Sequence, residues 1–424
     1  MTRPLLFGLA LLAILSNAAA GKSVLMLLQN ANTAERFTSF VDGLSAAGFT
    51  VDIKGYKDSG LKLREYGTWL YDHLILFAPK AEGFGGSIDQ QTILDFVDSG
   101  HNVLLGVNSD VSETMRSLAA EFGVDLDDRG TKVYDHFQSA TLDGKEDPTL
   151  IAASDLVDAP VIVGGPYKEP ILFRGVAAVV SPDSELATVV LSAPATAYSH
   201  DPKKSMLEPP SLMAGAAASL ITAVQARNNA RMVVSGSVEM FSNSFLAATV
   251  TAGGKSTATA NKDFVNTLTR WTFQDRGVLV ASNMRHHLLG SEDQPWGYRV
   301  NDDVEFLVDV MEVEGGESKP YKADDVQVEF IMLNPYVRQP LAHDGAGTFS
   351  LRFKVPDVYG VFKYVVDYSH RGYSYIKLTH QVPVRPFKHN EYERFLVCAY
   401  PYYASALSMM AGFFVLGFYF LYTK

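Results

Sequence analysis

Polar and glycine residues follow several apolar segments that we expect to be strands of one parallel sheet. In such sheets ligands bind at the carboxyl ends of the strands, so the loops that follow them would form one crevice. Amide and carboxylate groups around a glycine-rich bend could hold a sugar or an extended peptide. The candidate residues for this recognition crevice are Asn30, Gly83, Gly85, Gly86, Asp110 and Glu239.

A second interpretation of these residues stays open. Loops are polar in any fold of this class. Gly83, Gly85 and Gly86 would then serve only the geometry of the backbone. The sequence does not decide whether the crevice binds a sugar, a peptide or nothing.

Catalytic residues cannot be assigned. An amidotransferase on this kind of sheet needs a cysteine nucleophile after a strand, paired with a histidine. The one cysteine, Cys398, lies instead beside a long apolar segment near the carboxyl end. The Gly-x-Ser-x-Gly pentapeptide of α/β hydrolases is absent from the sequence. Ser109 follows a predicted strand, but no particular histidine and aspartate can be assigned to it.

Metal and cofactor motifs are equally weak. His286 and His287 are adjacent, so their spacing does not place them on one helix face. Asp125, Asp127 and Asp128 resemble an Asp-x-Asp metal clamp, but an acidic solvated turn is the simpler interpretation. Residues 345–347 lack the third glycine of a dinucleotide fingerprint. We predict no metal and no cofactor.

The elements that would position the crevice follow from hydrophobic periodicity. Short apolar strands alternate with amphipathic helices, which predicts a mostly parallel sheet with helices on both faces. We expect Thr33 to cap the first helix. The expected strands are 24–28, 49–53, 74–77, 103–107 and 232–235, and the expected helices are 33–48, 88–97, 112–122, 212–225 and 263–274. Residues 251–262 are predicted to form a surface loop.

The period changes to two after residue 276. Val304, Phe306, Val308 and Val310 alternate with mainly polar neighbours, and later segments repeat the pattern. Such runs, separated by turn residues, predict an antiparallel β-sandwich of about seven strands. We therefore expect a lumenal α/β domain at 21–276, a lumenal β-sandwich at 277–390 and a juxtamembrane linker at 391–401.

Both ends of the chain carry membrane-related signals. Residues 1–20 have a basic start, a short apolar core and small residues before a cleavage site, as in a signal peptide. Residues 402–422 contain no Asp, Glu, Lys or Arg and are long enough to cross a bilayer as one helix. Residues 423–424 would be a cytosolic tail. These features predict a single-pass type I membrane protein whose bulk is lumenal.

Small residues recur every fourth position in the predicted span. Ala404, Ser408 and Gly412 would line up along one face of the helix. Small side chains allow two helix backbones to approach closely in lipid. We therefore expect this face to dock onto a partner helix.

The overall composition limits the possible partners. The formal net charge is −11, whereas nucleic-acid binding requires a basic surface, so we expect no nucleic-acid partner. Hydrophobic residues make up 47% and charged residues 20% of the chain, as in folded globular proteins.

Four segments resemble one known family, the 48-kilodalton subunits of eukaryotic oligosaccharyltransferase. They preserve the order of that family's segments over essentially the whole mature chain. These segments are Tyr71–Asp110, QARNNAR at Gln225–Arg231, VPDVYGVFKYVVDY at Val355–Tyr368, and YERF at Tyr392–Phe395 with the residues up to Met410.

The resemblance implies a non-catalytic subunit of the endoplasmic reticulum complex that N-glycosylates nascent proteins. The implied partners are the catalytic multispanning subunit, the ribophorins and the subunit called defender against cell death. It also implies that the first domain is a doubly wound, amidotransferase-like sheet without the catalytic cysteine. Many members have a longer lysine-containing tail, so retention here would depend on the complex.

Two other classes remain as alternatives. One is a lumenal single-span hydrolase or amidotransferase-like enzyme, which the missing nucleophile disfavours. The other is a type I membrane receptor or adhesion protein, which the lack of lumenal cysteines and the short tail disfavour.

Overall fold

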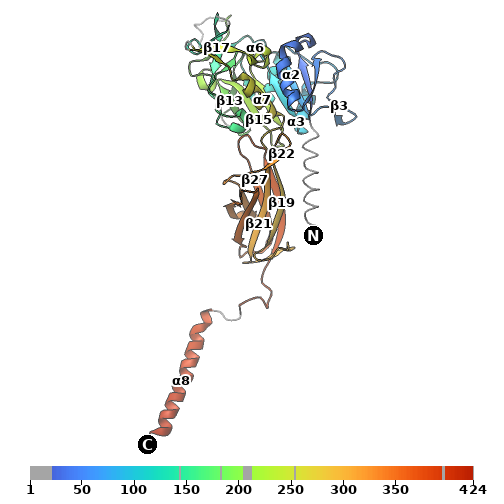
Figure 1. Ribbon diagram of the computed structural model, residues 1–424. Coiled ribbons are helices and arrows are strands. Elements are labelled where there is room, and N and C mark those ends of the chain that lie inside the picture. Colours follow the sequence, from blue (N-terminus) through green and yellow to red (C-terminus); the bar gives the residue numbers. More distant parts are fainter. Residues whose placement is uncertain are drawn as a thin grey trace.

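The computed structural model describes residues 22–142, 145–181, 184–203, 213–252, 255–393 and 397–423. It has an α/β part, a β part and a separate carboxy-terminal helix (Figure 1). The mixed α/β and β composition predicted from the sequence is therefore confirmed. The predicted signal peptide at 1–20 lies outside the described residues, as does Lys424.

The α/β part is built around a nine-stranded sheet. Its order is β2-β1-β5-β6-β16-β15-β12-β7, with β13 also paired to β15. The first five strands in this order are parallel. They are β2 (Thr50–Gly55), β1 (Ser23–Leu28), β5 (His73–Phe77), β6 (Asn102–Gly106) and β16 (Arg231–Ser235). The antiparallel remainder is β15 (Ser219–Gln225), β12 (Ala178–Val180), β7 (Val124–Leu126) and β13 (Ala187–Ser192).

Helices cover both faces of this sheet. Adjacent residues of a strand point to opposite sides, so they pack against different helices. Met26 belongs to a cluster with side chains of α2 (Thr38–Ala46) and α7 (Asn261–Thr272). Its neighbour Leu25 belongs to a second cluster, with side chains of α3 (Gln90–Asp98) and α4 (Glu113–Glu121). The central strands are thus buried on both faces, as the continuous apolar runs predicted.

Short elements complete the α/β part. A five-stranded sheet has the order β11-β10-β9-β17-β18, and two strand pairs are β8 with β14 and β3 with β4. The strands are β3 (Arg64–Glu65), β4 (Thr68–Trp69), β8 (Lys132–Tyr134), β9 (Ser139–Leu142), β10 (Lys145–Ala153), β11 (Ile171–Phe173), β14 (Tyr198–His200), β17 (Thr249–Ala252) and β18 (Lys255–Ala258). The short helices are η1 (Ala31–Phe37), α5 (Pro160–Val163), η2 (Gly215–Ala217), η3 (Glu239–Phe241) and α6 (Asn243–Leu246).

Three local predictions were wrong. The helix expected at 212–225 is strand β15 over Ser219–Gln225, because an apolar run buried on both faces has no periodicity that separates strand from helix. The loop expected at 251–262 contains the hairpin β17–β18 and the start of α7. Thr33 lies inside η1, where its hydroxyl donates to the Asn30 carbonyl (2.6 Å), so it is not a helix cap.

The β part has two five-stranded sheets that share one buried cluster. One sheet has the order β19-β21-β26-β25 with β22 on β21, and the other β20-β28-β27-β23-β24. Phe306 of the first and Tyr364 of the second stack with ring centroids 5.0 Å apart. The strands are β19 (Val278–Leu288), β20 (Tyr298–Arg299), β21 (Asp303–Glu314), β22 (Glu317–Pro320), β23 (Gln327–Ile331), β24 (Pro335–Pro340), β25 (Ala342–His343), β26 (Thr348–Lys354), β27 (Gly360–Tyr368) and β28 (Ile376–Arg385). The described strands outnumber the seven predicted, because short edge strands such as β20 and β25 leave little periodicity.

The last element is a long apolar helix. After the short turn η4 (Val397–Ala399), α8 (Tyr400–Tyr422) continues almost to the end of the chain. Within the stretch Val397–Tyr422 an 18-residue window reaches a mean hydropathy of 1.8, and the stretch is long enough to cross a membrane. In Figure 1 this helix stands apart from both sheet-rich parts.

Candidate functional site

A small hollow lies at the carboxyl edge of the parallel strands, where the recognition crevice was predicted. Its volume is about 300 Å³. Of the six predicted crevice residues, Asn30 lines it. The other lining residues are Gln29, Ala31, Gly55, Tyr56, Lys57 and Asp58.

Two glycines of the predicted bend pack against the chain beside this hollow. The Gly85 amide donates to the Tyr56 carbonyl (2.7 Å). A Cβ atom on Gly85 would lie 2.3 Å from the Asp58 carbonyl oxygen, and one on Gly86 would lie 2.0 Å from that of Leu61. Gly86 also has φ +64°. Gly83 has open space around it. Positions 85 and 86 therefore require glycine, because the neighbouring backbone lies too close to leave room for a Cβ atom.

Asp110 is held by a lysine of the preceding loop. Its carboxylate lies 2.9 Å from Lys80 Nζ, and this hydrogen bond lowers the pKa of Asp110. The Lys80 amide in turn donates to the Gln29 side chain (3.2 Å), which joins two of the predicted loops. Both charged groups are about half exposed. The ion pair thus lies at the carboxyl edge of the sheet, and neither of its charges is buried.

Glu239 pairs with an arginine that the sequence did not indicate. Arg174 Nε lies 2.6 Å from Glu239, and its Nη1 lies 3.3 Å from Asp147. The guanidinium also lies over the Phe245 ring, 5.6 Å from its centroid. Arg174 follows β11 and comes 65 residues before Glu239, so no local pattern could reveal the pair.

Asn243, the first residue of α6, contacts two other elements. Its side-chain oxygen accepts from the Ser39 amide (2.9 Å), and its nitrogen donates to the Glu35 carbonyl (2.9 Å). These contacts link α6 to η1 and α2. Most of the polar groups expected to face a ligand are thus occupied in protein contacts. Within the described ranges, no group of three or more His, Cys, Asp or Glu side chains is arranged to hold a metal ion.

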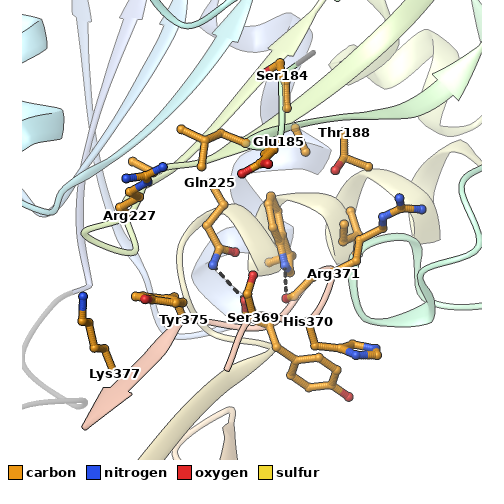
Figure 2. Close-up of a pocket in the computed structure, with 18 residues that line it drawn as sticks. Ser184, Glu185, Thr188, Gln225, Arg227, Ser369, His370, Arg371, Tyr375 and Lys377 are labelled. Atoms are coloured by element: carbon orange, nitrogen blue, oxygen red, sulfur yellow. Dashed lines mark hydrogen bonds between the residues drawn. The ribbon is translucent and has the colours of Figure 1, made fainter. Parts of the chain in front are cut away.

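A larger pocket lies between the α/β part and the β part (Figure 2). Its volume is about 690 Å³, within the range of small-molecule sites. Thr188, Ala223 and Gln225 line it from strands β13 and β15, and Trp271 lines it from α7. The opposite wall is formed by the loop 369–375 between β27 and β28.

Hydrogen bonds fix that loop to the α/β part. Gln225 Nε2 donates to the Tyr373 carbonyl (2.8 Å), and Trp271 Nε1 donates to the Gly372 carbonyl (2.7 Å). Asn229 makes two bonds with the backbone of Tyr375, at 2.6 and 3.0 Å. Two of these residues belong to the QARNNAR segment, which therefore forms much of the junction.

Arg231 is the buried centre of this junction. Its guanidinium donates to the carbonyls of Trp271 (2.8 Å), Arg276 (2.6 Å) and Gly277 (2.6 Å). No carboxylate partner is recorded for it among the described residues, and burial lowers the pKa of Arg231 to about 9. The guanidinium presents its donors in a fixed planar geometry, so it holds these carbonyls in one arrangement at the junction.

The rim of the pocket carries charge. Figure 2 shows Arg227 and Lys377 on one side and Arg371 on the other, with Glu185 between them above. Arg227, Arg371 and Lys377 are all exposed. The rim thus has three cations and one carboxylate, although the chain as a whole carries −11. The sequence did not predict this pocket, since its walls come from five separate segments of the chain.

Family models match nearly the whole chain. The model described as OST48, N-terminal domain matches residues 15–275, and the model described as OST48 middle domain matches residues 286–424. The chain belongs to the OST48 family. The resemblance stated from the sequence is therefore confirmed.

Named members of the OST48 family are similar over almost their full length. Each is called the 48 kDa subunit of dolichyl-diphosphooligosaccharide–protein glycosyltransferase. The Arabidopsis thaliana protein is 46% identical, over 95% of this chain and 93% of its own. The Danio rerio protein is 40% identical (99% and 96%), and the Caenorhabditis elegans protein is 38% identical (98% and 95%).

A solved structure shows a much weaker similarity. A ThuA-like protein from Parabacteroides merdae aligns with 60% of this chain and 90% of its own, at 13% identity and a TM-score of 0.32. A similarity this low assigns no fold to the OST48 chain.

Proposed function

We propose that this chain is a non-catalytic subunit of the oligosaccharyltransferase complex, needed for its assembly and activity in N-linked glycosylation. The observation that carries the proposal is the 46% identity to a named 48 kDa subunit over 95% of the chain. The proposed partners are the multispanning catalytic subunit, the ribophorins and defender against cell death. The hydrolase and receptor alternatives are not favoured by these relatives.

The proposal places the chain in the endoplasmic reticulum membrane with type I topology. Helix α8 would be its single span, and both sheet-rich parts would lie in the lumen. The parallel order β2-β1-β5-β6-β16, with helices on both faces, supports a doubly wound, amidotransferase-like domain at 21–276. The shared cluster of two antiparallel sheets supports a β-sandwich at 277–390.

The contacts at the carboxyl edge support a role without chemistry. A general acid or base must reach its substrate by a hydrogen bond. Asp110 and Glu239 are instead paired with Lys80 and Arg174. We propose that this edge, with Asn30 in its small hollow, is a recognition surface for glycan or acceptor peptide.

Purification of the chain free of other subunits tests the non-catalytic role. We expect no transfer of glycan from a dolichol-linked donor to a sequon peptide. Adding the chain back to a complex depleted of it should restore transfer, because assembly requires it. Turnover by the isolated chain, retained after rigorous removal of other subunits, would refute the proposal.

Substitution of the two edge carboxylates tests the recognition role. Asp110→Ala and Glu239→Ala complexes should assemble and keep turnover, with changed preference among acceptor peptides or donor glycans. If each change abolished turnover while assembly and substrate affinity stayed normal, a catalytic role would have to be assigned to the edge.

A further inference from the structure

Five large apolar side chains are exposed at one end of the β part. An isolated exposed apolar residue is ordinary, whereas a group of them marks an interaction surface. Two of them are almost completely exposed. The set, named here the apolar tip, is Leu333 (92% exposed), Trp296 (89%), Tyr359 (68%), Val361 (56%) and Leu289 (52%).

Strand register places these residues at the same end. Val361 pairs with Pro383, close to the last residue of β28, and Tyr359 directly precedes β27. Ile331 pairs with Lys363, so Leu333 lies two residues further toward that end.

The other sheet and its edge complete the tip. The Leu289 amide donates to the Asp303 carbonyl (2.9 Å), at the first residue of β21. Trp296 lies two residues before β20, whose Tyr298 pairs with Val384 near the end of β28. The apolar tip therefore draws on both sheets.

This end is also where the chain leaves for the apolar helix. Strand β28 ends at Arg385 and α8 starts at Tyr400, so residues 386–399 connect them. Fully extended, this connection spans at most about 50 Å. The opposite end of the β part is joined to the α/β part, where the Gly315 amide donates to the Asp275 carbonyl (2.9 Å). Figure 1 shows the connection leaving the end of the β part that lies away from the α/β part.

The residue types of the tip suit the surface of a bilayer. Tryptophan and tyrosine favour the headgroup level, and leucine and valine favour the acyl boundary just below it. Exposed carboxylates, including Glu292, Asp293 and Asp357, lie in the loops that carry the tip. These negative charges oppose attraction to anionic lipids, so binding would depend on apolar burial.

We propose that the apolar tip inserts into the headgroup region of the membrane that α8 crosses. The proposal rests on the proposed membrane span, which holds the tip near the bilayer at high effective concentration. A weak apolar contact is then enough to hold the β part against the membrane. The chain would be attached at two places, which fixes the height of the pocket and crevice above the bilayer.

Lipid quenching of a probe on the tip tests the proposal. The full chain, with Cys398→Ser to remove its cysteine, carries a fluorescent label at Leu333→Cys or at Glu317→Cys. Glu317 is an exposed residue of β22, beside the end joined to the α/β part. Each protein is placed in phosphatidylcholine vesicles containing headgroup-level nitroxide lipid. Extraction at alkaline pH reports separately whether α8 is integrated.

We expect the label at 333 to be quenched at least about twofold more than the label at 317, as interfacial insertion requires. Because the contact is apolar, raising the salt concentration should leave the difference unchanged. Trp296→Asp with Tyr359→Asp should abolish it, and both positions are exposed enough to accept aspartate. Equal quenching at 333 and 317 in integrated protein would overturn the proposal and leave the subunit role intact. Release of the chain by alkaline extraction would instead refute the proposed span, and the tip insertion with it.

Discussion

The Arg231 guanidinium lies over the Trp271 ring, 4.7 Å from its centroid, and both side chains donate to the Gly372 carbonyl. Arg231 is fully buried in the α/β part, whereas Gly372 belongs to a loop of the β part. One cation and one indole thus join the two parts through backbone carbonyls. Both terminal nitrogens of the guanidinium donate to carbonyls, whereas its buried Nε has no hydrogen-bond partner in the part of the chain that the structure describes. A cation that is stacked on tryptophan and bonded to carbonyls tolerates burial better than an isolated charge.

Arg231→Met should weaken this junction strongly. The methionine removes the charge-assisted hydrogen bonds to the carbonyls of Trp271, Arg276 and Gly277, and a hydrogen bond to a charged group contributes about 1.5–3 kcal/mol. The Trp271 and Gly277 carbonyls keep the Gln274 and Ser374 amides as donors. We expect the free energy of unfolding to fall by about 3 kcal/mol or more, and calorimetry to resolve separate transitions for the two parts.

The matched control is Arg227→Met, in the same segment. Arg227 is exposed, so its loss should change the stability by at most about 0.5 kcal/mol. Equal melting curves for the two variants would show that the Arg231 contacts do not hold the parts together.

His286 should make the β part less stable in acid. Its Nδ1 lies 2.8 Å from the Tyr298 hydroxyl and its Nε2 lies 3.1 Å from Gln294 Nε2, so the neutral ring bonds on both sides. Burial lowers the pKa of His286 to about 4, and His380 and His287 add to the shift. Between pH 6.5 and 4 the unfolded chain binds a proton that the folded chain does not. Stability from this group is therefore present above pH 6.5 and lost as the pH falls to about 4, by about 3 kcal/mol in total.

Chemical denaturation at several pH values measures this loss. His286→Gln, which cannot titrate but can hydrogen-bond, should flatten the dependence in that window. His287→Gln, on the opposite face of β19, should keep most of the wild-type slope, because burial is the largest cause of the His286 shift. An unchanged slope in His286→Gln would assign the acid sensitivity to other groups.

Much of the architecture was predictable because local patterns reflect one-sided or two-sided burial. Val304, Phe306 and Val308 alternate in sequence, and all are buried on the shared face of β21. The parallel strands were visible as short continuous apolar runs. The same rule failed for Ser219–Gln225, where a strand buried on both faces was predicted as a helix.

The site was less predictable because its contacts join distant segments. Glu239 was singled out, but its partner Arg174 is not marked by any local motif. QARNNAR was recognised by resemblance, yet its role at the junction depends on Tyr373 and Tyr375, almost 150 residues later. The glycines at 83–86 left two interpretations open. Backbone contacts at Gly85 and Gly86 favour the geometric one for those two residues.

Gly86→Ala should destabilise the α/β part locally. Its positive φ and the Leu61 carbonyl oxygen leave no place for a Cβ atom, and strain of this kind costs about 1–3 kcal/mol. Gly83→Ala is the control, since open space surrounds that residue and the change should be nearly neutral. Thermal unfolding compares the two. A fully stable Gly86→Ala variant would contradict the close approach of the 56–61 segment.

The last prediction concerns the α8 face formed by Ala404, Ser408 and Gly412, which we propose docks onto a partner helix. All three are exposed, and a Cβ atom on Gly412 would meet nothing within 4 Å in the single chain. In lipid there is little hydrophobic attraction between helices, so close backbone packing must supply the association. Gly412→Leu keeps the helix apolar but fills the surface where another backbone would approach. We expect normal membrane insertion and loss of co-purifying subunits in mild detergent.

Gly417→Leu provides the matched control for that experiment, because it is the same substitution at a position on the opposite face of the helix, where a Cβ atom also meets nothing within 4 Å. Its complexes should be recovered at the wild-type level, while Ser408→Leu should behave like Gly412→Leu since both lie on one face. Alkaline extraction must leave all variants in the membrane for the comparison to report on packing. If Gly412→Leu and Ser408→Leu complexes both stayed intact, α8 would act as an anchor only. Assembly would then depend on the surfaces of the α/β and β parts.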